Sequence, residues 1–133
     1  MGNSTDYLGI RLSKELYADF MTYCKTNKIS VAYAIELLAD ECIKRNNVPF
    51  SLGVSNDANL KYEVWRKKTE DGKTITNEAR KSIFFERNKR EDFQKICEDK
   101  IGLKMSNVVK AFMVYCITNE PPLPYSFENK GDK

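Results

Sequence analysis

The residues with the clearest chemical potential are four cysteines: Cys24, Cys42, Cys97 and Cys116. Cysteine thiolates can hold zinc or pair as disulfides. No two of these cysteines form a CxxC pair, and the chain contains no histidine, so a zinc site would need all four widely spaced thiolates. Each cysteine lies in an apolar helical pattern. We therefore expect buried thiols without a bound metal, as is usual in the cytoplasm.

Catalytic motifs are also missing. The lack of histidine removes the commonest general base, and no nucleophile elbow, phosphate loop or glycine fingerprint is present. We therefore expect a binding protein rather than an enzyme, without a cofactor. The first residues lack the pattern of an export signal, and no apolar run approaches the roughly 20 residues that span a bilayer. These features predict a cytoplasmic protein without membrane contact.

Charges of both signs are nearly balanced along the 133 residues, with 22 basic and 19 acidic side chains. The length fits one compact domain or two very small ones. A nucleic-acid-binding protein with this balance would have to place its positive groups locally.

The first part of the chain predicts a strand followed by two helices. In "YLGIRLS" (residues 7–13) apolar and polar side chains alternate, as in a strand with one buried face. Ser13 and Ser30 can each cap a following helix that has one apolar stripe. Pro49 prevents the second helix from continuing. The five residues that follow this helix, "VPFSL" (residues 48–52), form the exit phrase of the unit.

The same order of elements returns later. "SIFFER" (residues 82–87) is rich in strand-forming residues, and Asn88 with Glu91 matches a capping box for the next helix. Gly102 is a helix-ending glycine, and Ser106 can cap the helix after it. The exit phrase here is "LPYSF". The chain therefore resembles an internal duplication, with units at 7–52 and 81–127; the alternative is a small helical protein without a true repeat.

The linker between the units, residues 53–80, predicts an inserted β-hairpin. "LKYEVWRKK" alternates, Asp71-Gly72 is a hairpin-turn signal, and "KTITNE" supplies the second strand. The alternative is a flexible polar linker. Trp65 beside Lys67 and Lys68 has the composition of a surface that touches DNA phosphates or a partner, unless Trp65 only pins the hairpin to the core.

A single strand with two short helices buries too little surface to be stable alone. We therefore expect residues 7–12 and 82–87 to pair antiparallel, with the helices of both units packed beneath them. The predicted fold is mainly α with a short β ribbon, in which two units of one chain form a pseudo-dimer. Such a ribbon fits the major groove of B-DNA.

The stretch "GIRLSKELYADFMTYCKTNKISVAYAIELLADECI" resembles a ribbon-helix-helix domain of the Arc/MetJ/CopG kind. The two exit phrases are similar to the "PF" phrase that follows the second helix in RelB/DinJ-type antitoxins. The presence of two units in one chain resembles TraY-like conjugation proteins. The first copy matches well, whereas the second matches in its helices and poorly in its strand.

The resemblance implies that alternate residues of the paired strands read bases. In the first strand these are Tyr7, Gly9 and Arg11; a guanidinium can bond a guanine edge, although Arg11 could equally be a solvated strand residue. In the second strand they are Ser82, Phe84 and Glu86. A slip of one residue would turn a different set outward: Lys81, Ile83, Phe85 and Arg87.

The resemblance also implies that the start of each second helix holds a DNA phosphate through backbone N–H groups. The matching residues are Ser30, Val31, Ser106 and Asn107. Simple helix capping would need the same residues. Lys67 and Lys68 of the linker are further candidates for phosphate contacts.

Two functions follow as expectations. The first is sequence-specific binding of double-stranded DNA, as a small transcriptional regulator or as a relaxosome accessory protein at a plasmid transfer origin. The second is a protein-interaction module, antitoxin-like or adaptor, without direct DNA binding. The balanced charge of the first half, Glu86 and the "YEVWRKK" segment favour the second. A relaxase, a toxin or a second copy of the chain would then be the partner.

Overall fold

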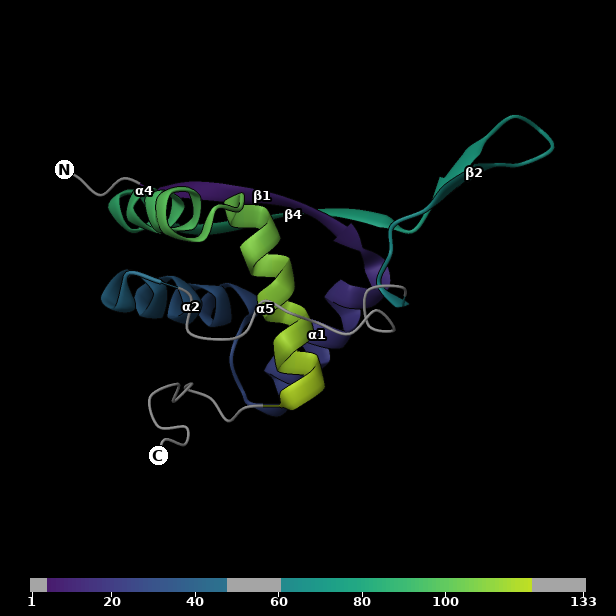
Figure 1. Cartoon of the computed structure of the whole chain (residues 1–133). Helices are drawn as coiled ribbons and strands as arrows, with labels where there is room; N and C mark the ends of the chain where they lie inside the picture. The colour runs from purple at the N-terminus through teal and green to yellow at the C-terminus, as the bar shows by residue number, and fades with distance from the viewer. Residues whose placement is uncertain (1–4, 48–60, 121–133) are drawn as a thin grey trace.

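The structure is a computed structural model and describes residues 5–47 and 61–120. It combines helices with two small antiparallel sheets. The longer sheet is a ribbon formed by β1 (Thr5–Ser13) and β4 (Glu78–Glu86), and helices lie beneath it (Figure 1). Both exit phrases, with Pro49, lie outside the described residues.

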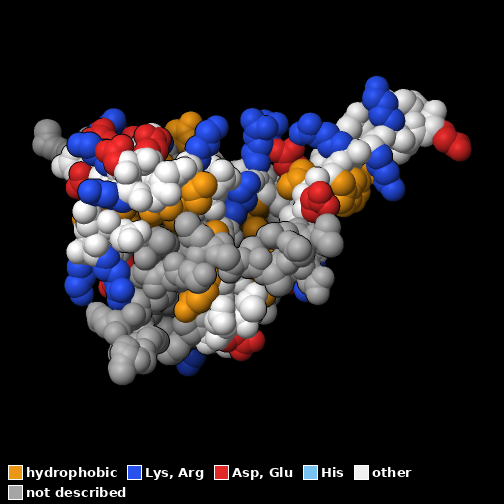
Figure 2. All heavy atoms as spheres, viewed as in Figure 1, with side chains coloured by type: hydrophobic (Ala, Val, Ile, Leu, Met, Phe, Trp, Pro, Cys, Tyr) orange, Lys and Arg blue, Asp and Glu red, His pale blue; other side chains and the backbone are white. Residues whose placement is uncertain are grey.

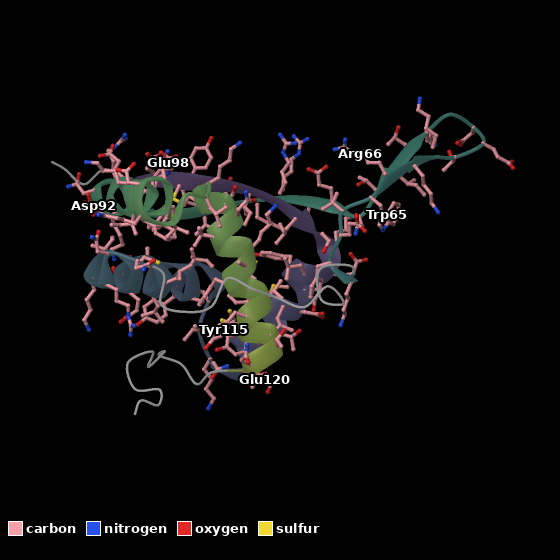
Figure 3. The ribbon with its side chains drawn as sticks, viewed as in Figure 1. Trp65, Arg66, Asp92, Glu98, Tyr115 and Glu120 are labelled. Carbon is pink, nitrogen blue, oxygen red and sulfur yellow. The ribbon has the colours of Figure 1, made fainter. Side chains whose placement is uncertain are left out.

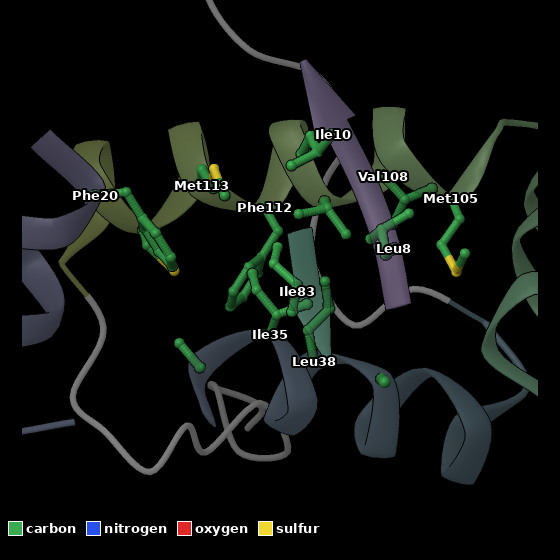
Figure 4. Close-up of a cluster of buried hydrophobic side chains, with 14 of the residues drawn as sticks. Leu8, Ile10, Phe20, Ile35, Leu38, Ile83, Met105, Val108, Phe112 and Met113 are labelled. Carbon is green, nitrogen blue, oxygen red and sulfur yellow. The ribbon is translucent and has the colours of Figure 1, made fainter. Parts of the chain in front are cut away.

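The ribbon forms because apolar side chains alternate along both strands. Its inner face is buried and consists of Leu8, Ile10, Leu12, Ile83 and Phe85. These side chains pack on the helices beneath them (Figure 4). The alternate residues of both strands point away from the core and are exposed, so the ribbon has one buried and one open face.

Antiparallel pairing of the two strands within one chain is confirmed, but the second strand begins earlier than predicted. Residues 7–12 pair with residues 79–84, whereas the sequence predicted 82–87. Arg87 already belongs to the next helix, since the chain passes from strand to helix without a loop. The slipped register is wrong because Ile83 and Phe85 are buried, which leaves Ser82, Phe84 and Glu86 on the outer face.

The first two helices begin where the sequence predicted. Ser13 caps α1 (Lys14–Thr26), and its hydroxyl oxygen accepts a hydrogen bond from the Leu16 amide at 3.0 Å. Ser30 caps α2 (Val31–Arg45) in the same way, accepting from the Tyr33 amide at 3.0 Å. Both caps follow from local sequence.

The later helices depart from the prediction at their starts. Glu86, not Asn88, caps α4 (Arg87–Lys95): its carboxylate accepts from the Lys89 amide at 3.1 Å, because the strand ends only at Glu86. Lys104 precedes α5 (Met105–Asn119), so Ser106 lies within the first turn rather than capping it.

Between α4 and α5 lies a short π-helix, η1 (Ile96–Ile101). Gly102 ends it with φ of 84°, in the left-handed region that glycine adopts without steric cost, as the sequence predicted.

The core is built by helices from opposite halves of the chain. α1 packs against α5, and α2 packs against α4. Other elements surround α5, so residues on several of its sides are buried. The buried residues of α5 are Met105, Val108, Val109, Phe112, Met113, Val114 and Cys116. No single helix among residues 5–47 and 61–120 is long and apolar enough to cross a membrane; by length and composition alone, the segments 87–101 and 105–119 would do so only as a pair bent by 85°.

The predicted hairpin is present as β2 (Arg66–Lys68) and β3 (Thr74–Thr76), which stand away from the helices (Figure 1). Gly72 lies in its turn with φ of 86°. The strand expected over "LKYEVWRKK" is limited to its last three residues. Before it, Tyr62 turns toward α1 and its hydroxyl donates to the Asp19 carboxylate at 2.6 Å.

Candidate nucleic-acid interface

The outer face of the ribbon brings together all six residues predicted to read bases. Tyr7 lies opposite Phe84, and Gly9 lies opposite Ser82. Tyr7 and Phe84 are 51% and 59% exposed, and their ring centroids lie 5.9 Å apart. Large aromatic side chains this exposed in pairs are unusual on a surface that contacts only water.

Arg11 faces a residue that sequence reasoning missed. Its cross-strand partner is Arg80, and both guanidinium groups extend into solvent. Arg80 was missed because the strand was expected to start at Ser82. Extending the alternation of Phe84 and Ser82 by one more step toward the N-terminus would have placed Arg80 on the same face.

Three arginines lie close to the Glu78 carboxylate at the end of the ribbon that continues into the hairpin. This carboxylate lies 2.5 Å from an Nη of Arg66, and 3.7 Å from the Nε atoms of Arg11 and Arg80. The Glu78 side chain is only 7% exposed. The hydrogen bond from Arg66, followed by the positive charges of the three guanidinium groups, lowers the pKa of Glu78. The group is therefore an ionised carboxylate with a surplus of positive charge around it.

Cationic side chains continue from the ribbon onto the hairpin (Figure 2). Arg66, Lys67 and Lys68 of β2 are exposed. Trp65 is 45% exposed, and the ammonium group of Lys67 lies 5.4 Å from the centroid of its ring. Trp65 therefore does not pin the hairpin to the core. It lies with Arg66 where the hairpin leaves the ribbon (Figure 3).

Asn77, which sequence reasoning did not single out, holds the base of the hairpin instead. This residue is 5% exposed. Its side chain accepts from the Trp65 amide at 2.8 Å, and donates to the Glu15 carboxylate at 2.9 Å and to the Glu63 carbonyl at 3.0 Å. The Asn77 carbonyl accepts from the Lys14 amide at 2.7 Å. Asn77 thus links the hairpin to the start of α1.

The other end of the ribbon is fixed to α4 by ion pairs. The guanidinium of Arg90 donates to the Tyr7 carbonyl at 2.7 Å, and the Asp6 carboxylate lies 3.8 Å from Arg87 and 4.0 Å from Arg90. Glu86, predicted to read a base, uses its carboxylate to cap α4. Three arginines thus share the one carboxylate of Glu78 at the hairpin end, whereas two arginines share that of Asp6 at the α4 end.

The predicted phosphate-binding residues at the helix starts differ between the two halves. At the start of α2, the Ser30 hydroxyl is occupied by the cap, and the helix has no acidic residue in its first turn. α5 also has no acid there, but the Asn107 amide donates to the Lys104 carbonyl at 3.0 Å, so it is not the open N–H group that was predicted. The predicted serine thus precedes the helix at α2, whereas at α5 Ser106 is the second residue of the helix.

All four cysteines are buried, as expected. Burial raises the pKa of Cys24 to about 11 and that of Cys97, next to Glu98, to about 12. Thiols with such pKa values are poor nucleophiles at neutral pH. Within residues 5–47 and 61–120, no group of three or more Cys, Asp or Glu side chains is placed to hold a metal ion.

Comparison with known proteins gives no family for this chain. No protein-family model, no curated protein and no solved structure matches it.

Proposed function

We propose that the protein binds double-stranded DNA sequence-specifically, with the β1–β4 ribbon in the major groove. One observation carries this proposal: the ribbon has a buried inner face and an open outer face, on which two exposed arginines lie opposite each other. The major groove admits a two-stranded ribbon, and arginine forms bidentate hydrogen bonds with guanine.

The proposed architecture is that of two ribbon-helix-helix units in one chain, forming an intramolecular pseudo-dimer. The sequence predicts units at residues 7–52 and 81–127, but β4 begins at Glu78, so the second unit would begin at residue 78 and the joining segment would end at residue 77. This proposal is supported by the pairing of β1 with β4 and by the packing of α1 on α5 and of α2 on α4, since each half then depends on the other for its core.

Arg11 and Arg80 are the proposed readers of guanine, and Tyr7 and Phe84 would contact thymine methyl groups. Gly9 lies between them, where the absence of a side chain lets bases approach the backbone. Ser82, opposite Gly9, can bond either kind of base edge. Glu86 contributes less, because its carboxylate already caps α4.

Phosphate contacts are proposed at two places. The N–H groups at the start of α2, at Ser30 and Val31, favour an anion because the positive end of the helix dipole lies there. Lys67 and Lys68 on the hairpin supply exposed positive charges. Asn107 stays in the proposal as a neighbour of Lys104 rather than as a donor, because its amide bonds the Lys104 carbonyl, and Ser106 stays as a proposed donor in the first turn of α5.

In the cell, this activity would suit a small cytoplasmic transcriptional regulator or an accessory protein at a plasmid transfer origin. The test is an electrophoretic shift assay with duplexes from around the protein's own gene and from a random library. Arg11→Ala should weaken binding to the selected site by about 1–3 kcal/mol. Lys25→Ala, which removes an exposed cation from the last turn of α1, should leave binding unchanged.

The second candidate function is a protein-interaction module, and exposed apolar side chains at the hairpin favour it. Val64, Trp65 and Ile75 are 40%, 45% and 41% exposed. Failure of the wild-type protein to shift any duplex, or to select a sequence from the library, would favour this second function over DNA binding.

A further inference from the structure

The outer face of the ribbon has different chemistry at its two ends. At the α4 end, the aromatic rings of Tyr7 and Phe84 lie side by side with centroids 5.9 Å apart. At the hairpin end, Arg11 and Arg80 face each other, each with its Nε 3.7 Å from the Glu78 carboxylate. Each kind of side chain thus occurs as a cross-strand pair, with one residue from each strand.

This arrangement is the opposite of what a symmetric ribbon would have. The middle pair of the register is Gly9 with Ser82. A two-fold axis through that pair would exchange Tyr7 with Arg80 and Arg11 with Phe84, so that both ends would present the same groups. In this ribbon the axis would exchange an aromatic residue with an arginine in both cases. The two ends of the outer face are therefore chemically different, and the face can distinguish the two orientations of a DNA site.

The arginine end is stabilised by its own acid. Two like charges directly opposite each other in a sheet repel. Glu78, with its side chain 7% exposed, lies next to both guanidinium groups and offsets that repulsion, while the side chains of Arg11 and Arg80 remain 67% and 69% exposed. Their outward N–H groups therefore stay available to a ligand.

We infer that the ribbon recognises a directional, non-palindromic duplex, with guanine under the arginine pair and thymine under the aromatic pair. The inference rests on the proposed function and specifies its ligand. Guanine presents two acceptors, N7 and O6, to a guanidinium fork, and thymine presents a methyl group to an apolar ring. Between the ends, a Cβ built on Gly9 would meet only the Tyr7 ring, at 3.8 Å, so the middle of the ribbon can lie close to the bases.

The hairpin provides a second difference between the two ends of the bound complex. It leaves the ribbon at the arginine end, where Arg66 bonds Glu78. Its cations, Lys67, Lys68 and Lys73, are exposed. The protein should therefore cover more DNA beyond the guanine end of the site than beyond the thymine end.

The first experiment tests each end with single-atom changes in the DNA. A site is selected from a random duplex library with the wild-type protein. Replacing guanine by 7-deazaguanine removes the N7 acceptor and should weaken binding by about 5- to 150-fold at the guanine end. Replacing thymine by deoxyuridine removes only the methyl group and should weaken binding about fourfold per contacted methyl.

Protein variants show which residues contact the replaced base atoms. The combined variant Arg11→Ala/Arg80→Ala should be insensitive to 7-deazaguanine but still sensitive to deoxyuridine, and Tyr7→Ala/Phe84→Ala should show the reverse. Arg11→Lys keeps the charge and loses the planar fork, so its binding should lie between that of wild type and that of Arg11→Ala. Tyr7→Phe keeps the ring and should behave as the wild type. All four residues are exposed, so these variants keep the core, which a thermal melt can verify.

Orientation is tested by attaching an iron chelate through Lys73→Cys, since the four native cysteines are buried. Hydroxyl-radical cleavage should occur beyond the guanine end only. A palindromic selected site, cleavage on both sides, or equal sensitivity of both variants to both base changes overturns the inference and leaves DNA binding standing. If the wild type selects no duplex, the proposed function fails and the inference fails with it.

Discussion

The ribbon and the hairpin are both two-stranded antiparallel sheets, yet they are held in different ways. The ribbon buries one face against the helices, and Ile83 on that face is 3% exposed. All hairpin strand residues except the half-buried Thr76 are exposed, and Ile75 is 41% exposed. An isolated two-stranded hairpin is at best marginally stable in water. The hairpin therefore needs another source of order.

Polar contacts at its base provide that order. Besides the hydrogen bonds of Asn77, the Thr76 hydroxyl donates to the Trp65 carbonyl at 2.6 Å, and Arg66 contacts Glu78 at 2.5 Å. The comparison teaches that apolar burial fixes the ribbon as part of the core. By contrast, a few hydrogen bonds fix only the direction in which the hairpin points. Changes to the two sheets should then have effects of very different size.

The largest effect should come from removing apolar volume under the ribbon. Ile83→Ala should lower the free energy of unfolding by about 2–5 kcal/mol, since it removes buried methylene groups and leaves a cavity. Ile75→Ala makes the same chemical change on the hairpin and should cost within about 0.5 kcal/mol, because its side chain is already in contact with water. Urea denaturation of both variants measures the two values.

Equal losses for the two isoleucine variants would contradict the comparison. That outcome would mean that the hairpin packs on something in solution, such as a second copy of the chain. Repeating the urea denaturation over a range of protein concentrations would then reveal association.

The next effect in size should come from the polar link at the hairpin base. Asn77→Ala removes a buried amide that makes three hydrogen bonds, to Trp65, Glu15 and Glu63, so it should cost about 1–3 kcal/mol. Trp65 is the single tryptophan of the chain, so its fluorescence reports directly on the hairpin base. Asn119→Ala is the matched control: Asn119 is exposed, and its side chain donates to the Tyr115 carbonyl of its own helix. A loss no larger than that of the control would show that Asn77 is dispensable.

The elements predicted correctly from sequence are those whose signals are local. The alternation in β1 and the caps Ser13 and Ser30 depend on neighbouring residues only. The sequence did not indicate that β4 begins at Glu78, because the charged Lys81 occupies an inner-face position, where the alternation requires an apolar residue. The structure accommodates it at the edge, where its ammonium lies 4.5 Å from the centroid of the Tyr17 ring.

The features that sequence reasoning missed depend on contacts between distant residues. Whether Glu86 or Asn88 caps α4 is decided by where the strand ends, which is set by its pairing with β1. The role of Asn77 depends on Glu15, 62 positions away in the sequence. Arg80 and Glu78 of the candidate site were missed because the start of β4 was misplaced.

A smaller effect on stability is expected from removing the exposed part of the hairpin. Replacing residues 67–75 by a Gly/Ser linker of the same length keeps Asn77 and Glu78, and should change the free energy of unfolding by less than about 1 kcal/mol. Under the proposed function, the loss of Lys67, Lys68 and Lys73 should lower affinity for all duplexes and flatten the salt dependence by up to about three units. An unchanged salt dependence would assign the hairpin to a protein partner.

The smallest effect should be a dependence of stability on pH at the junction of the two sheets. The pKa of Glu78 is lowered below its ordinary value of 4.5 in the folded protein, chiefly by the hydrogen bond from Arg66. A depressed folded pKa stabilises the protein above the unfolded pKa, and this contribution disappears as pH falls through the folded pKa.

The difference in stability between wild type and Glu78→Gln should therefore be present at pH 7 and shrink below pH 4.5. Ion pairs near a surface contribute little each, so the change should be small. Glu70→Gln, which removes a carboxylate from the exposed turn of the hairpin, is the matched control for the loss of one negative charge. A gap between wild type and Glu78→Gln that stays constant from pH 7 to pH 3 would show that Glu78 does not link the hairpin to the ribbon through its charge.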